Sequence, residues 1–219
     1  MAPEAKRVRE TIRLLREHYP ESRTALEFRS PFEILVATIL AAQCTDERVN
    51  RITPGLFRKY PAPADFARAK PTELEKDIRT AGFFRNKAKS IIGASRKIVE
   101  EFGGVVPDSM AALVTLPGVA RKTANIVLSA GYGKAEGIAV DTHARRLSQR
   151  LGLSKEDDPV KIERDLMAFV PKEDWLDFNF LLVDHGRAVC QARKPKCPEC
   201  FLRRLCPSAK EFFPGLEKR

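Results

Sequence analysis

The sequence predicts an all-α protein. Long segments repeat apolar residues at the spacing of one helix face, and Gly or Pro closes most of them. No segment shows the convincing alternation of apolar and polar residues that a half-buried β-strand requires. We therefore expect about ten helices joined by short turns.

The first periodic segment, 4–19, predicts an amphipathic helix. The next, Ser30–Gln43, carries a start signal, because Ser30 can N-cap, Pro31 suits the first helical position and Glu33 completes a capping box. Its apolar residues cover nearly every face, which predicts a helix buried at the centre of a helical domain. Further amphipathic helices are predicted, in order, over 71–82, 87–104, 108–118, 121–133, 141–152, 159–171 and 173–190.

The composition indicates a polyanionic partner. A chain of 219 residues can build one large domain or two small ones without disulfides. Its formal charge of +10 favours nucleic acid, because Lys and Arg that neutralise phosphates release counterions. The alternative is a merely soluble basic protein, but the basic residues are spread along the whole chain and not gathered in a tail.

No targeting or membrane segment is evident. The N-terminal stretch lacks the apolar run of a signal peptide, and no stretch approaches membrane-spanning length. We expect a monomer in the cytoplasm, associated with the nucleoid and without a membrane partner. Thiols stay reduced there, so clustered cysteines are more typical of metal ligands than of disulfides.

Four of the five cysteines lie between Cys190 and Cys206, with the spacing C-x6-C-x2-C-x5-C. Structural zinc sites usually pair two short knuckles, whereas this segment has one. A four-iron cluster takes four cysteines, which one compact loop can supply. The spacing alone favours zinc and an iron–sulfur cluster about equally for Cys190, Cys197, Cys200 and Cys206.

A Pro-Gly turn lies between two helical patterns in LPGVARKTAN, from Leu116. Backbone N–H groups around Gly118 and Ala120 at a helix start can hold a phosphate oxygen, although an ordinary interhelical turn is an equal alternative on the turn alone. Lys122 falls in the first turn of the second helix, where a partly buried amine has a lowered pKa and becomes a nucleophile. The alternative is a solvent-facing or phosphate-facing basic pair with Arg121.

Asp141 follows a short apolar run and precedes a helical pattern, so its default role is an N-cap. In a cleft, a capping carboxylate can also orient water or stabilise a developing cation. We interpret His143 as a hydrogen-bonding or phosphate-contacting residue rather than a base.

These motifs together resemble the bacterial endonuclease III family, base-excision glycosylases of the helix-hairpin-helix superfamily. The resemblance rests on LPGVARKTAN, on VDTH about twenty residues later and on the cysteine spacing, and also covers LAAQCTDERVN and AGFFRNKAKSII. It implies two helical domains flanking a DNA-binding cleft. One is a six-helix bundle over 23–135 with the hairpin, and the other, over 1–22 and 136–219, holds the cluster.

The resemblance implies a bifunctional DNA glycosylase and AP lyase that acts on duplex DNA with oxidised pyrimidines or abasic sites. Lys122 matches the family's Schiff-base lysine, Asp141 its catalytic aspartate, and the four cysteines its 4Fe-4S ligands. Gln43 matches a residue that enters the space left by the extruded nucleotide, and Phe83 lies where the family usually has a leucine wedge. A monofunctional glycosylase or a non-catalytic DNA-binding paralogue is the alternative.

Two departures from the family pattern concern DNA binding. Ala120 stands where a second glycine is usual, which is acceptable only if its φ is negative. Phe83 is bulkier than leucine and can stack on a base. We also hypothesise that the cluster presents Arg193 and Lys194, in the loop QARKPK, to DNA phosphates.

Overall fold

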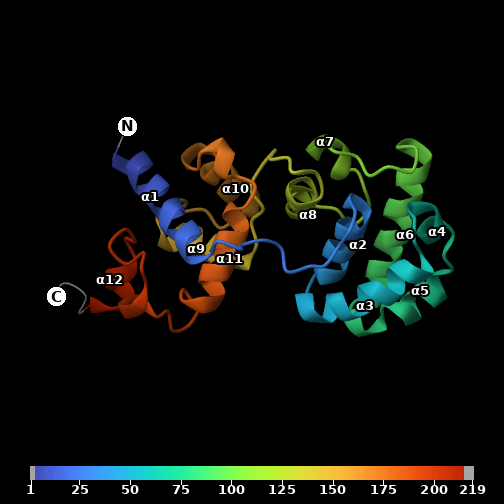
Figure 1. The fold of residues 1–219 in the computed structure, drawn as a ribbon, viewed down its shortest axis with the longest axis horizontal. Coiled ribbons are helices and arrows are strands. Elements are labelled where there is room, and N and C mark those ends of the chain that lie inside the picture. Colours follow the sequence, from blue (N-terminus) through green and yellow to red (C-terminus); the bar gives the residue numbers. More distant parts are fainter. Residues whose placement is uncertain (1–2, 215–219) are drawn as a thin grey trace. The chain divides into compact units, whose positions relative to one another are not determined.

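The structure, a computed structural model, describes residues 3–214, and every regular element in that range is helical (Figure 1). The all-α prediction is therefore confirmed. The chain forms two compact units. We call Thr24–Glu136 the middle unit, and Met1–Arg23 with Gly137–Arg219 the terminal unit.

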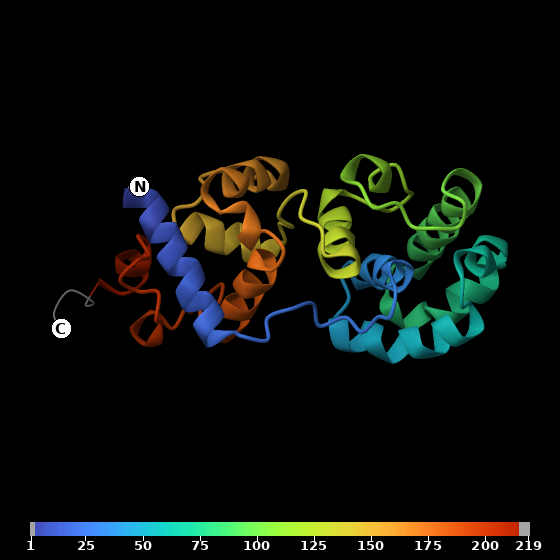
Figure 2. The same cartoon turned by 45° about the horizontal axis from the view of Figure 1, so that its top comes forward.

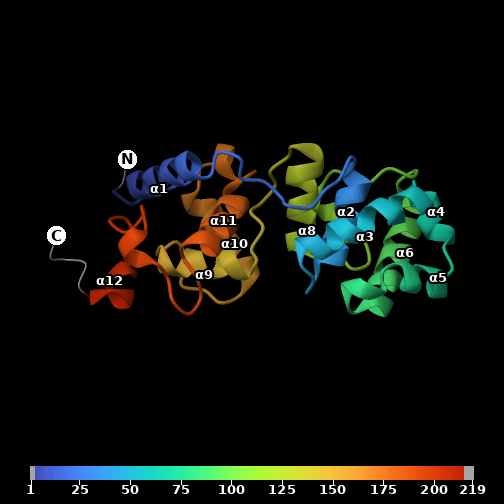
Figure 3. The ribbon, with the colours of Figure 1, turned by 60° about the horizontal axis from the view of Figure 1, so that its bottom comes forward.

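The middle unit contains seven α-helices within its described residues, together with a 3-10 turn at Arg79–Ala81 and a π-helical stretch at Val127–Gly131. Helices α4 to α6 pack together in this unit (Figure 3). The helices are α2 (Pro31–Ala41), α3 (Asp46–Lys59), α4 (Pro63–Arg68), α5 (Pro71–Asp77), α6 (Phe84–Glu101), α7 (Met110–Leu113) and α8 (Arg121–Ile126).

Helix α2 is the predicted central helix. It contacts α3, α6 and α8, and eight of its eleven residues are buried. The Ser30 hydroxyl accepts from the Glu33 N–H, as predicted. The prediction that Glu33 completes a capping box is wrong. Its carboxylate accepts from the Arg29 N–H at 2.7 Å and not from the N–H of Ser30, because it also pairs with the Arg29 guanidinium at 3.4 Å.

Helix α3 is absent from the elements that periodicity predicts. Thr45 starts it by accepting from the Arg48 N–H, and Pro54 lies inside it. An interior proline removes one backbone donor and usually ends a helix. Burial of Val49, Leu56 and Phe57 holds α3 against the rest of the unit.

The terminal unit joins the first helix to the C-terminal third of the chain. Helix α1 packs on α11, and α9 packs on α10 and α11 (Figure 2). Apolar residues from these four helices form its core. The helices are α1 (Pro3–His18), α9 (Thr142–Arg150), α10 (Pro159–Phe169), α11 (Phe178–Ala188) and α12 (Ala209–Phe212), with 3-10 turns at Lys172–Asp174 and Cys197–Glu199.

The helix predicted over 173–190 is shorter in the structure. It begins at Phe178, and Lys172–Asp174 forms a 3-10 turn. The Trp175 indole N–H donates to the Val170 carbonyl at 2.9 Å and so turns the chain back on the end of α10. No helix within residues 3–214 has the length and apolar character needed to cross a bilayer.

Candidate active site

The hairpin between α7 and α8 carries Lys122. Gly118 has φ +78°, and a Cβ added to it would lie 2.6 Å from the Ser90 Cβ of α6, so only glycine fits there without a shift. Ala120 has φ −93° and is the N-cap of α8, which removes the strain that a positive φ would bring. Lys122 is exposed as the second residue of α8, and not partly buried.

The helix that carries Lys122 changes its hydrogen-bond pattern after Ile126. Residues Val127–Gly131 form a π-helical stretch that packs against α2. Single-turn π segments are uncommon and occur often at functional sites. The sequence pattern predicted one helix over 121–133 and gave no sign of this change.

Asp141 caps helix α9 in the terminal unit. Its Oδ1 accepts from the backbone N–H groups of His143 and Ala144, both at 2.8 Å, so the N-cap prediction is confirmed. The His143 ring lies 3.1 Å from the Arg146 guanidinium. A Cβ on Gly186 of α11 would approach its Nδ1 to 2.6 Å, so His143 also packs closely on that helix.

Gln43 and Phe83 lie in the middle unit at the ends of loops. Gln43 follows α2 with φ +53°, and Phe83 is the N-cap of α6 with φ +46°. No other non-glycine residue within 3–214 has a positive φ. Both are exposed, and the Phe83 side chain keeps 62% of its surface accessible. A left-handed backbone costs an L-residue about 1–2 kcal/mol.

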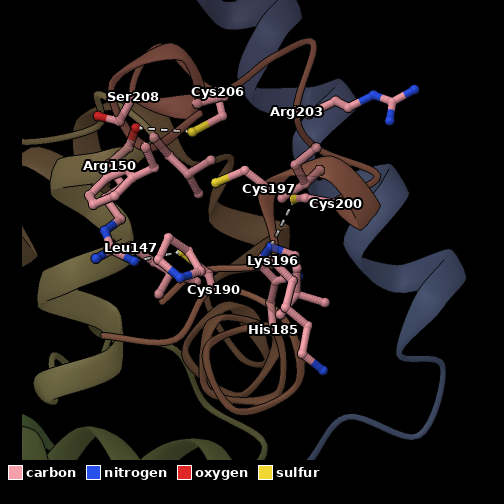
Figure 4. A pocket seen from close by; sticks show the side chains of 16 residues that line it. Leu147, Arg150, His185, Cys190, Lys196, Cys197, Cys200, Arg203, Cys206 and Ser208 are labelled. Carbon is pink, nitrogen blue, oxygen red and sulfur yellow. Dashed lines mark hydrogen bonds between the residues drawn. The ribbon is translucent and has the colours of Figure 1, made fainter. Parts of the chain in front are cut away.

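The four clustered cysteines line one pocket of the terminal unit (Figure 4). Their thiols are free and half-buried, and Cys190, Cys200 and Cys206 pack against the core. Burial, with smaller contributions from the neighbouring cysteines, raises the pKa of Cys200 to about 11. Leucine and valine side chains, among them Leu147, surround the thiols.

The donor set of this pocket is four thiols, which both a zinc ion and a four-iron cluster can take as ligands. Within residues 3–214, no three His, Cys, Asp or Glu side chains come close enough together to hold one metal ion. A zinc ion needs its thiolates about 2.3 Å from one centre. A four-iron cluster spreads its four cysteines over a larger core, and thiolates are the ligands it takes.

Two contacts of this pocket have no signal in the sequence pattern. His185 is 2% exposed, and its Nε2 lies 3.5 Å from the Cys200 sulfur while its Nδ1 lies 3.1 Å from the Tyr19 hydroxyl. Burial lowers the pKa of His185 to about 4, so the ring is neutral at neutral pH. Arg150, on α9, donates to the Cys190 sulfur at 3.3 Å.

Arg150 also fixes the loop that follows Cys190. Its guanidinium donates to the carbonyls of Gln191 and Ala192, each at 2.8 Å, and lies 4.3 Å from the centre of the Phe212 ring. Arg193 and Lys194 come next and are exposed. The structure therefore places these cations at the surface, beside a restrained backbone.

The predicted residues fall into separate groups. Gln43, Phe83 and Lys122 belong to the middle unit, and Asp141, His143 and the cysteines to the terminal unit. The pocket brings the four cysteines together.

Comparisons with known proteins agree on one family. Residues 36–172 match the HhH-GPD superfamily of base excision DNA repair proteins. The chain is 56% identical to endonuclease III of Synechocystis sp. over 209 residues, covering 95% of each chain. It is 41% identical to endonuclease III of Escherichia coli K12 over 202 residues, covering 92% of this chain and 95% of the relative.

Solved structures give the same result. A trapped endonuclease III–DNA covalent intermediate with an estranged adenine superposes with a TM-score of 0.89 at 40% identity, covering 94% of this chain and 97% of that one. A thermostable thymine-DNA glycosylase superposes with a TM-score of 0.85 at 27% identity, covering 94% and 98%.

Proposed function

We propose that Lys122 is the nucleophile of this chain, which belongs to the HhH-GPD superfamily of base excision DNA repair proteins. The chain is a DNA glycosylase with AP lyase activity. The observation that carries the proposal is the position of Lys122, exposed in the first turn of α8 and four residues after the hairpin glycine. A relative 40% identical to this chain was trapped as a covalent intermediate with DNA, which supports an amine nucleophile.

The proposed reaction starts with a nucleotide turned out of the duplex, because the sugar carbon is inaccessible inside the stack. The Lys122 amine attacks C1′ of the deoxyribose, the bond from C1′ to the damaged base breaks, and the base leaves with a proton from the amine. The bond from C1′ to the ring oxygen O4′ then breaks, O4′ takes the remaining amine proton, and the nitrogen and C1′ form an imine. Loss of a C2′ proton breaks the bond to the 3′ oxygen and cuts the strand.

The other residues have assigned roles in this proposal. Asp141 stabilises positive charge at the sugar and helps transfer protons. Gln43 and Phe83 fill the space that the nucleotide leaves, and Phe83 can stack on a neighbouring base. Backbone groups at Gly118 and Ala120 and the side chain of His143 contact DNA phosphates. The substrate class is oxidised or ring-saturated pyrimidines.

Borohydride trapping tests the nucleophile. The protein is mixed with a duplex containing thymine glycol, borohydride is added, and a covalent adduct is sought. Lys122→Ala should give none, whereas Lys97→Ala should trap like the wild type, because Lys97 pairs with Glu101 on α6. An adduct that persists in Lys122→Ala would refute the role of Lys122.

We propose that Cys190, Cys197, Cys200 and Cys206 hold a 4Fe-4S cluster. The support is their shared pocket, its apolar lining and a donor set of four thiols. When bound, the cluster crosslinks the C-terminal loop to the core. Visible absorbance and the iron content of the purified protein separate iron from zinc.

We further propose that the loop from Cys190 presents Arg193 and Lys194 to DNA phosphates. Reversing both charges should weaken DNA binding and flatten its salt dependence while the iron content stays the same. Unchanged affinity at equal iron content would refute this role. Because iron content is read separately, loss of the cluster cannot be mistaken for loss of phosphate contact.

A further inference from the structure

One buried lysine lies between the two segments that carry Gln43 and Phe83. Lys87, on the first turn of α6, is 5% exposed. Its ammonium donates to the Leu40 carbonyl at 2.8 Å and to the Ala81 carbonyl at 2.8 Å. Leu40 precedes Gln43 by three residues, and Ala81 precedes Phe83 by two.

Both acceptors are carbonyls at the ends of helical segments. Leu40 lies in the last turn of α2, and Ala81 ends the 3-10 turn Arg79–Ala81. Carbonyls in a last turn lack a partner within their helix, so a donor from elsewhere must satisfy them when they are buried. An ammonium has three N–H donors and no acceptor, so one lysine can hold both segments.

A buried ammonium is a costly way to satisfy two carbonyls. Burial lowers the pKa of Lys87, because removal from water disfavours the charged form. The two hydrogen bonds therefore come with the free-energy cost of removing an amine from water. What this arrangement fixes is the distance between the end of α2 and the start of α6, which are the segments that lead into Gln43 and Phe83.

The backbone beyond each clamped carbonyl is left-handed. Gln43 has φ +53° and Phe83 has φ +46°. Left-handed non-glycine residues persist only where the surrounding structure holds them, and they cluster at functional sites. Lys87 bonds to the two segments that carry the only such residues within 3–214.

We propose that Lys87 is a positioning residue for damage recognition. By clamping Leu40 and Ala81, it sets the spacing at which Gln43 and Phe83 enter the duplex together. This inference rests on the proposed function, in which these two side chains fill the space left by the extruded nucleotide. Lys87 itself touches neither the DNA nor the reacting atoms in this proposal.

The test measures discrimination between damaged and intact DNA. Affinities are measured for a duplex with a tetrahydrofuran abasic analogue, which cannot be cleaved, and for the same duplex undamaged. The ratio of these affinities reports insertion into the stack, and a 2-aminopurine opposite the analogue reports unstacking directly. Lys87→Met should lower the ratio by roughly fivefold or more, the order that one stacked aromatic contributes. Affinity for the undamaged duplex should stay unchanged.

Two control variants separate positioning from stability. Lys97→Met removes a lysine from the same helix that pairs with Glu101, and should keep the wild-type ratio. Ile91→Ala destabilises α6 at a fully buried site without touching either carbonyl, and should also keep it. A normal ratio in Lys87→Met, or an equal loss in Ile91→Ala, would overturn the proposal.

The remaining outcomes are distinguishable. If Phe83→Ala and Gln43→Ala both keep the wild-type ratio, the proposed function of these side chains fails, whatever Lys87 does. If they lose it and Lys87→Met does not, only the positioning role fails. If Lys87→Met does not fold, Lys87→Gln is compared in the same way. Its shorter side chain keeps two donors, so the affinity ratio should fall by less than in a variant with no donor. A wild-type ratio in Lys87→Gln would overturn the proposal.

Discussion

Replacing Gly118 by alanine should destabilise the middle unit severely. Two costs combine at this position. The first is the left-handed backbone, φ +78°, which costs an L-residue about 1–2 kcal/mol. The second is a clash, because the new Cβ would lie 2.6 Å from the Ser90 Cβ and 2.7 Å from its Oγ. Carbon atoms prefer about 3.5–4.0 Å, and overpacking of this kind costs about 1–3 kcal/mol.

The two costs are separable by matched variants. Gly133 also has a positive φ, +62°, but a Cβ there meets nothing within 4 Å, so Gly133→Ala should lose only the backbone part, about 1–2 kcal/mol. Gly118→Ala should lose about 2–5 kcal/mol, the sum of both parts. Urea unfolding followed by circular dichroism measures each free energy of unfolding.

A double variant isolates the clash. Ser90→Gly removes the atoms that the new Cβ meets, at a cost of about 0.5 kcal/mol in helix propensity. Combined with Gly118→Ala it should recover about 1–3 kcal/mol, which is the coupling between the two sites. Strictly additive losses would show that the hairpin does not pack on α6 as the structure describes. A cost for Gly118→Ala no larger than that for Gly133→Ala would refute the clash directly.

Four further changes test the candidate site. Asp141→Asn keeps an N-cap acceptor, so it should leave the melting temperature almost unchanged while slowing borohydride trapping roughly 100-fold or more. Asp141→Ala should slow trapping in the same way and also lose about 1 kcal/mol of stability, because the cap is removed. Ala120→Gly should leave affinity for an abasic duplex unchanged, because φ is already negative, and tighter binding would contradict this reading. Burial lowers the pKa of Lys87 in the folded state, so the unfolded chain binds that proton more tightly. The free energy of unfolding in urea, taken relative to Lys87→Met, should therefore rise as the pH approaches 10.5. A fall in this difference would be contrary evidence. Phe83→Gly should stabilise the protein by about 1 kcal/mol by relieving the left-handed backbone, yet lose discrimination for the abasic duplex, and unchanged discrimination would deny Phe83 its role.

The features that the sequence predicted correctly depend on near neighbours. Ser30 bonds to an N–H three residues later, and Asp141 bonds to N–H groups two and three residues later. Such contacts are determined by residue type and position at a helix start, so the pattern is sufficient to find them. Even there, a competing charge can redirect a side chain, as the pairing of Glu33 with Arg29 shows.

The features that the sequence could not predict depend on distant partners. Lys87 bonds to Leu40, 47 residues away, and Arg150 bonds to Gln191, 41 residues away. A basic residue within an amphipathic helix is ordinarily assigned to its solvated face, so neither contact has a local signal. Only the tertiary packing shows that Lys87 is buried and that Arg150 restrains the cysteine loop.

Gln43 and Phe83 have a strained backbone that folding alone does not explain. Neither residue type favours a left-handed backbone, and the exposed Phe83 ring buries little apolar surface to offset the cost. A glycine would remove the strain, so folding alone gives no reason for these side chains at these positions. Lys87 bonds to the segments that precede both residues. At these two positions the backbone conformation disagrees with the preference of the residue type. Such disagreement is typical of a surface shaped for a ligand. We propose that in this chain the ligand is the base stack of DNA.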